Sequence, residues 1–145
     1  MMENLDFKKI RSICAELEEN IGVYNWREVV EKLLDDNKDF EVAGYRFISL
    51  DSIDKIQQQE LESDEYVLGC FNAWFLTSHL EMSEDCIKAI QEKAPDALGQ
   101  LIISKGVLPD IQRDYAEADG YGHHFAHYDH EEVETSFGYS AFRVQ

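Results

Sequence analysis

Apolar residues recur at helical spacing along most of this chain. Between positions 10 and 21, intervals of three and four residues place them on one stripe, and a second stripe covers positions 26–34. Asn25 stands where a side chain caps the second of these helices. A shorter helix is predicted from Asp51 or Ser52 onward. The first stripe consists of Ile10, Ile13, Cys14, Leu17 and Ile21, and the second of Trp26, Val29, Val30, Leu33 and Leu34.

The most apolar segment is residues 63–80, SDEYVLGCFNAWFLTSHL. At helical spacing it places apolar side chains on more than one face, and such a helix is usually central and buried. Val67, Cys70, Phe71, Trp74 and Phe75 share one of these faces. The three cysteines of the chain lack CxxC spacing and stand in apolar surroundings. They are therefore expected to be buried, reduced thiols.

Three further helices follow this segment. Ser83 is placed to cap the first of them, and the two prolines, Pro95 and Pro109, fit the first turns of the next two. Gly120 is expected to end the last one.

Two stretches have a strand pattern instead. Residues 39–49 contain two β-prone runs around Ala43-Gly44, and residues 132–144 repeat this pattern around Phe137-Gly138. Two hairpins can share one small antiparallel sheet that is stable when helices cover it. The predicted fold class is α+β, mostly helical, with residues 1–145 forming a single globular domain.

The charge of the chain excludes several classes of function. Thirty acidic residues against thirteen basic ones give a formal net charge of −17. This charge repels nucleic acids and anionic membrane surfaces, and no basic patch typical of a direct nucleic-acid binder is visible. The longest apolar run, YVLGCFNAWFL, has eleven residues, whereas a membrane-spanning helix needs about 20. No targeting signal is visible, so a cytoplasmic protein is expected.

The acidic residues between positions 51 and 85 are a candidate binding surface. One base, Lys55, accompanies them in this segment, which alone carries −8. In one interpretation, such acids keep the protein soluble, and those at helix N-termini interact favourably with the helix dipole. Alternatively, they form a surface that binds a basic partner and takes the place of nucleic acid in its binding groove. The nine residues are Asp51, Asp54, Glu60, Glu62, Asp64, Glu65, Glu81, Glu84 and Asp85.

A histidine-rich stretch, DGYGHHFAHYDHEEVE (residues 119–134), offers the second candidate site. On a helix His123, His127 and His130 would share one face and could begin a divalent-metal site, such as zinc, with Asp129 as an oxygen donor. Two glycines and several mediocre helix formers favour an irregular loop instead. On that interpretation no metal or other cofactor is bound. The spacing alone leaves both alternatives open.

Motifs of other catalytic sites are missing from the chain. It contains no GxxxxGK, GxGxxG, GxSxG or HExxH sequence. Acidic residues are so numerous that no two of them stand out as an acid/base pair. An enzymatic activity is therefore not indicated.

Two segments, SDEYVLGCFNAWFL and ADGYGHHFAHYD, resemble parts of small uncharacterised acidic proteins of phages and prophage-like mobile elements. The similarity runs from about the first hairpin to His130. That group has no assigned activity or site residues. The resemblance implies a context, namely an accessory protein that blocks or redirects the machinery of its host cell, in the host cytoplasm.

The expected function is therefore a non-enzymatic interaction with a basic partner protein, for example a nucleic-acid-binding one. A metal-binding protein or metal-dependent enzyme is the alternative. Self-association through exposed aromatic residues, such as Tyr121, Phe125 and Tyr128, is a third hypothesis. Neither direct nucleic-acid binding nor membrane binding is expected.

Overall fold

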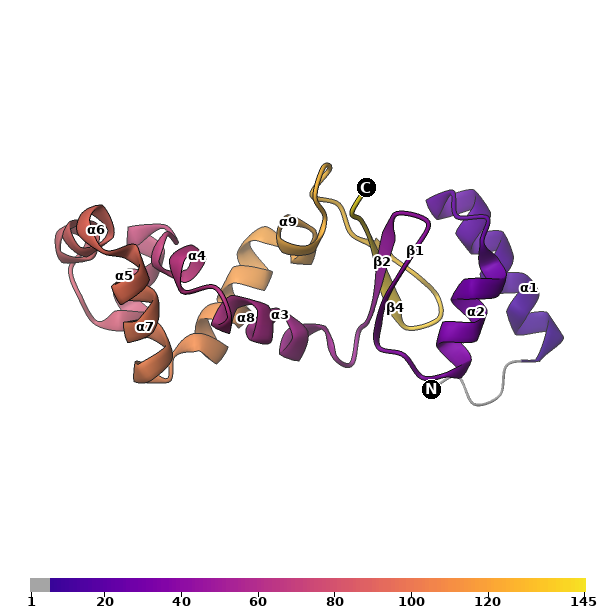
Figure 1. Cartoon of the computed structure of the whole chain (residues 1–145), viewed down its shortest axis with the longest axis horizontal. Coiled ribbons are helices and arrows are strands. Elements are labelled where there is room, and N and C mark those ends of the chain that lie inside the picture. Colours follow the sequence, from indigo (N-terminus) through magenta and orange to yellow (C-terminus); the bar gives the residue numbers. More distant parts are fainter. Residues whose placement is uncertain (1–5) are drawn as a thin grey trace. The chain divides into compact units, whose positions relative to one another are not determined.

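The computed structural model describes residues 6–145 and confirms the α+β class (Figure 1). The chain divides into two compact units. The sheet unit contains the residues up to Ile53 together with Asp119–Gln145, and the helical unit contains Asp54–Ala118. Each unit has its own hydrophobic core. The single domain expected from the sequence stays a prediction.

The two predicted hairpins form one antiparallel sheet in the sheet unit. Its strands are β1 (Asp39–Val42), β2 (Tyr45–Ser49), β3 (Val133–Glu134) and β4 (Tyr139–Arg143), in the order β1-β2-β4-β3. Phe47 of β2 lies opposite Phe40 of β1 and Ala141 of β4. Ala43 and Gly44 both have a positive φ, which is the conformation that a tight two-residue hairpin requires.

One face of this sheet packs against the N-terminal helices. These are α1 (Phe7–Glu16), the π-helical turn η1 (Leu17–Ile21) and α2 (Trp26–Leu34), which Figure 1 shows on one side of the strands. The predicted apolar stripes supply the buried side chains of these helices. Asn25 lies at the N-terminal boundary of α2, but its side chain makes no capping hydrogen bond, so that part of the prediction is wrong.

The opposite face carries the histidine-rich stretch. Residues Tyr121–Phe125 form a short helix, α9, rather than the irregular loop that we expected. Phe125 is buried, and its ring lies 5.1 Å from that of Phe142 on β4. Gly122 approaches the backbone of His130 so closely that a Cβ would lie 2.2 Å from its carbonyl oxygen. Tertiary packing of this kind overrides the weak helix propensity of the sequence.

The helical unit contains the remaining helices. The capping by Ser83 and the first-turn positions of Pro95 and Pro109 are confirmed, and Gly120 follows directly after α8. The bounds are α3 (Ile53–Glu62), α4 (Glu65–Gly69), α5 (Ala73–Leu80), α6 (Glu84–Lys93), α7 (Pro95–Lys105) and α8 (Leu108–Asp119).

The predicted central helix over residues 63–80 is wrong, because the chain turns at Cys70–Asn72 between α4 and α5. Asn72 caps α5 by accepting a hydrogen bond from the backbone N–H of Phe75. The Gln91 side chain donates to the carbonyl oxygens of Gly69 and Phe71, at 3.0 and 2.6 Å. These bonds satisfy the backbone groups that the interruption of the helix leaves without helical partners.

Two glycines set the packing of α4 on α7. A Cβ on Gly69 would lie 1.8 Å from the carbonyl oxygen of Pro95, and a Cβ on Gly99 would lie 2.0 Å from that of Glu65. The two backbones therefore touch directly at both points. Any larger residue at either glycine forces the helices apart.

A buried amide network joins α3 to α8. Gln57 and Gln112 are both buried. The Gln112 amide donates to the Gln57 side-chain oxygen at 2.7 Å and to Asp54 at 2.9 Å, and Gln58 donates to the Gln112 oxygen at 3.2 Å. Within the described residues, the Gln57 Nε2 has no hydrogen-bond partner. The network therefore carries an unsatisfied donor on α3.

Replacing Gly69 or Gly99 with alanine is expected to destabilise the helical unit by about 3 kcal/mol, because overpacking here moves backbone rather than a flexible side chain. Gly106→Ala is the matched control, since its Cβ would meet nothing within 4 Å and it carries only the strain of a φ of +76°. Its cost should be about 1 kcal/mol. Urea unfolding followed by circular dichroism measures both. Equal losses for Gly69 and Gly106 would contradict the contact.

The two buried glutamines should respond differently to replacement by methionine. Gln57→Met removes the unsatisfied donor, so we expect a change in unfolding free energy within about 1 kcal/mol. Gln112→Met leaves the whole Gln57 amide unpaired and should cost about 2–3 kcal/mol. Urea unfolding midpoints compare the two variants. A larger loss of unfolding free energy for Gln57→Met than for Gln112→Met would contradict this hydrogen-bond network.

Candidate functional site

Eight of the nine predicted acidic residues lie in the helical unit, on or beside α3 to α6. Asp51, the ninth, belongs to the sheet unit and precedes α3. All eight side chains are exposed or partly exposed. The eight are Asp54, Glu60, Glu62, Asp64, Glu65, Glu81, Glu84 and Asp85.

Several of these acids also have a local structural role. Asp64 caps α4 by accepting from the N–H of Val67 at 3.1 Å. Glu84 lies in the first turn of α6 and pairs with Lys88 at 3.0 Å. Glu65 accepts from the Gln100 amide at 3.0 Å. Acids at helix N-termini are stabilised by the helix dipole, so part of the sequence pattern has this simple cause.

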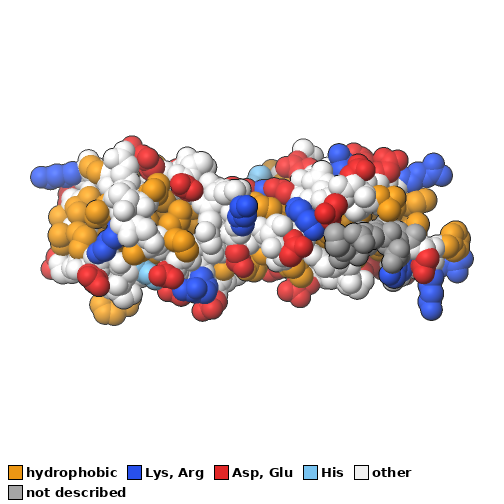
Figure 2. Space-filling model, turned by 90° about the horizontal axis from the view of Figure 1, so that it is seen from below, with side chains coloured by type: hydrophobic (Ala, Val, Ile, Leu, Met, Phe, Trp, Pro, Cys, Tyr) orange, Lys and Arg blue, Asp and Glu red, His pale blue; other side chains and the backbone are white. Residues whose placement is uncertain are grey.

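The number of acids still exceeds what the helical unit can neutralise. Residues 54–118 contain thirteen carboxylates and five lysine or arginine residues, and eight of the carboxylates fall between positions 54 and 85 with one base, Lys55. Pairing one to one would leave most of these charges exposed to solvent. Figure 2 shows carboxylates spread over the visible face of the protein, with hydrophobic side chains between them, rather than one dense patch.

Exposed apolar side chains lie on α4 and α5, close in sequence to several of these acids. Trp74 is 70% exposed, Tyr66 59% and Val67 41%, and Cys70 between them is also exposed. The predicted burial of Val67, Cys70 and Trp74 on one helix face is therefore wrong, and Cys86, also predicted to be buried, is exposed. A hydrogen bond from the Tyr66 hydroxyl to the neighbouring Cys70 raises the pKa of Tyr66, because only the protonated hydroxyl can donate it. We call Tyr66, Val67, Cys70 and Trp74 the α4–α5 apolar surface.

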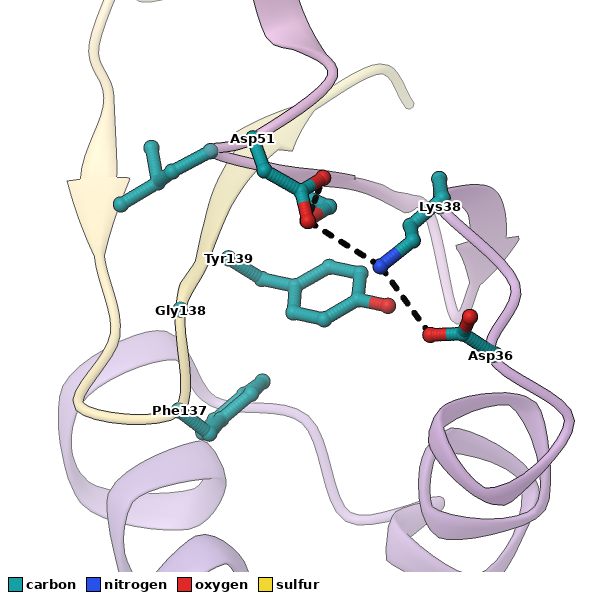
Figure 3. A pocket seen from close by; sticks show the side chains of 8 residues that line it. Asp36, Lys38, Asp51, Phe137, Gly138 and Tyr139 are labelled. Atoms are coloured by element: carbon teal, nitrogen blue, oxygen red, sulfur yellow. Dashed lines mark hydrogen bonds and ion pairs between the residues drawn. The ribbon is translucent and has the colours of Figure 1, made fainter. Parts of the chain in front are cut away.

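A pocket of about 240 Å³ lies in the sheet unit, at the ends of the two hairpins (Figure 3). Its polar centre is the Lys38 ammonium group, which lies 3.0 Å from the Asp36 carboxylate and 3.2 Å from that of Asp51. Phe137 and Tyr139 supply aromatic walls. The sequence does not predict this pocket, because its residues come from segments about 90 positions apart and form no local motif.

The groups in this pocket are not adapted to acid/base chemistry near neutral pH. Hydrogen bonds from Ser49, Ser52 and Lys38 lower the pKa of Asp51 to about 2. The Asp36 and Asp51 carboxylates raise the pKa of Lys38, and burial raises that of Tyr139. The Tyr139 hydroxyl donates to the Asn37 carbonyl at 2.7 Å. Each shift moves a pKa further from neutral pH, whereas a general acid or base works best with a pKa near the operating pH. We therefore interpret the cluster of Asp36, Lys38 and Asp51 as an electrostatic clamp between the segment before β1 and the segment after β2.

The side chains of His123, His127 and His130 do not converge on one point as the ligands of a metal would. His123 and His130 stack, with ring centroids 5.1 Å apart. The His127 Nδ1 atom lies 3.2 Å from the Val144 carbonyl oxygen. The Asp129 carboxylate accepts from the N–H of Glu131 in a local turn. Over residues 6–145, no three His, Cys, Asp or Glu side chains are grouped to hold a metal. The metal alternative stays a prediction.

The Asp51 clamp has a testable pH dependence. Because the pKa of Asp51 falls from 3.8 to about 2 on folding, its contribution to stability is present above pH 4 and lost as the pH falls through 2. The side chain is 66% exposed, so solvent screening limits this contribution to less than about 1 kcal/mol. Urea midpoints of wild type and Asp51→Asn should differ at pH 6 and converge towards pH 2.

The first cause of this shift is the Ser49 hydroxyl, which donates to Asp51 at 2.8 Å. Ser49→Ala should therefore raise the pKa of Asp51, as followed by NMR of its carboxyl carbon. A wild-type Asp51 that titrates at 3.8 would show that the clamp does not exist in solution.

Among residues 6–145, no helix has the length and apolar character needed to cross a membrane. Comparisons of the chain with protein-family models, with curated proteins and with solved structures found no match.

Proposed function

We propose that this protein is a non-enzymatic interaction protein whose acidic helical unit binds a basic, nucleic-acid-binding protein. The observation that supports this most is the excess of carboxylates over cations in residues 54–118, with acids concentrated on α3, at the start of α4 and at the start of α6. Exposed charges of one sign steer an oppositely charged partner and raise its association rate.

Nucleic-acid mimicry is the more specific form of this proposal. Double-stranded DNA carries one charge per about 1.7 Å of axis, and a basic groove built for that density also attracts a surface rich in carboxylates. A mimic occupies the groove, so the partner cannot bind its nucleic acid at the same time. The origin in a mobile element and the host cytoplasm as location belong to this proposal and rest on the resemblance of the two sequence segments.

A quadruple neutralisation tests the acidic surface. Replacing Glu60, Glu62 and Glu65 with Gln, and Asp64 with Asn, removes four charges and keeps a capping side chain at position 64. The association rate with the partner, measured by biolayer interferometry at low salt, should fall by about tenfold or more. It should also fall steeply between 50 and 300 mM salt, because screening acts over about 8 Å at physiological ionic strength.

A matched control removes four exposed acids from the sheet unit instead. Glu18, Glu19, Glu28 and Glu31 lie on η1 and α2, and their replacement with Gln gives the same net charge. This control should change the rate by less than about threefold, because only general steering is lost. If the two variants lowered the association rate equally, the acids of the helical unit would contribute only through the net charge of the protein.

Competition tests the mimic itself. The partner is saturated with the duplex DNA or RNA that it binds, and this protein is then added at increasing concentration. A mimic displaces the nucleic acid in proportion to its occupancy. A stable ternary complex, seen by size-exclusion chromatography, would rule mimicry out while leaving the acidic interaction in place.

A further inference from the structure

The α4–α5 apolar surface has a geometric origin. Glu65 and Gly69 face α7, as the contacts of Gly69 and Gly99 show. At about 100° per residue, Val67 lies about 200° from Glu65 and so points away from α7, and the exposed Cys70 follows the end of α4. On α5 the buried residues are Ala73, Leu76 and Leu80, and Trp74 lies on the other side. The exposure of these side chains thus follows from the packing of the two helices.

These apolar side chains have the composition of an interface centre. Tryptophan and tyrosine are enriched among the residues that contribute most to binding, and a polar or charged rim surrounds them in known interfaces. Here Asp64 and Glu65 begin the helix that carries Tyr66 and Val67, and Glu60 and Glu62 precede it. An apolar centre beside carboxylates would fit a partner surface that has apolar residues in its middle and basic residues around them.

We infer that the α4–α5 apolar surface is the docking site for a basic amphipathic helix of a partner protein. Trp74 and Tyr66 contact the apolar face of that helix, and the carboxylates around α4 pair with its lysine and arginine residues. This inference rests on the proposed function, because it specifies what the acidic surface binds. Residues 54–118 contain no strand, so a helix is favoured over a peptide that extends a sheet.

A second copy of the chain is the competing occupant. Its most basic stretch is at the start of α1, where Phe7 is 74% exposed and Lys8, Lys9 and Arg11 are close in sequence. The Arg11 guanidinium lies over the Phe7 ring at 5.2 Å. Each copy carries −17, however, and this charge repels a second copy while it attracts a basic protein. The charge complementarity therefore favours a different protein.

Two synthetic peptides test the inference with the full chain. One is an 18-residue Lys/Leu peptide whose leucines follow helical spacing, and the other has the same composition in scrambled order. Both carry fluorescein for anisotropy titrations. The amphipathic peptide should bind at least tenfold more tightly than the scrambled one. In Trp26→Phe protein, Trp74 is the remaining tryptophan, and its emission should shift to the blue on binding.

Variants separate the apolar contribution from the acidic one. Tyr66→Ala with Trp74→Ala should reduce the preference for the amphipathic peptide to less than threefold, without changing the binding of the scrambled one. Tyr24→Ala with Tyr128→Ala is the matched control, because these exposed tyrosines lie in the sheet unit. This control should keep the full preference. Circular dichroism establishes that each variant is folded.

The outcomes distinguish the two proposals. If both peptides bind equally and with the same salt dependence, the acidic surface stands and the docking of an amphipathic helix is wrong. If neither peptide binds in a salt-dependent way, the proposed function itself fails. Sedimentation equilibrium of the protein alone gives the third result. If it dimerises, and the Tyr66–Trp74 double variant is monomeric, a second copy occupies the surface and the inference is overturned.

Discussion

The direct backbone contact between α4 and α7 determines the arrangement of the helical unit. Gly69 and Gly99 allow the two helices to approach until carbonyl groups fill the space where a Cβ would lie. This contact holds α4 against α7, and α4 ends at Gly69, so no continuous helix forms over residues 63–80. The chain turns after Gly69, and α5 packs separately through Ala73, Leu76 and Leu80. Val67 is exposed on the side of α4 away from this contact, and Trp74 is exposed on the side of α5 away from its buried residues.

The sequence predicted the α+β class, both hairpins and most helix bounds, because these depend on local periodicity and on turn and capping residues. It failed where a residue acts through a distant partner. Gly69 resembles an ordinary glycine inside an apolar helix until Pro95 is known to lie against it. Likewise, α9 forms because Phe125 packs on Phe142 and Gly122 lies against the His130 backbone. Neither contact leaves a pattern within one segment.

The candidate sites also differ in how far the sequence predicts them. The acidic residues could be identified from composition alone, and the structure adds that Asp64 and Glu84 also stabilise helix starts. The sequence pattern predicts burial for Val67, Cys70 and Trp74, because a helical pattern shows which residues share a face but not what covers that face. The pocket around Lys38 leaves no pattern within one segment, so the sequence does not predict it. There, Asp36 and Asp51 neutralise the partly exposed Lys38, whereas the carboxylates of the helical unit outnumber its cations.

The order of the two units along the chain has a consequence for biosynthesis. Strand β2 pairs with β1, made just before it, and with β4, made about 90 residues later. The sheet unit can therefore be completed only when β4 has left the ribosome, while the helical unit, which is encoded between β2 and β4, relies on contacts nearer in sequence. Local contacts form quickly and distant strand pairing slowly. The helical unit, with its acidic surface, can thus fold while half of the sheet is still unmade, and the incomplete edge of β2 is exposed during that interval.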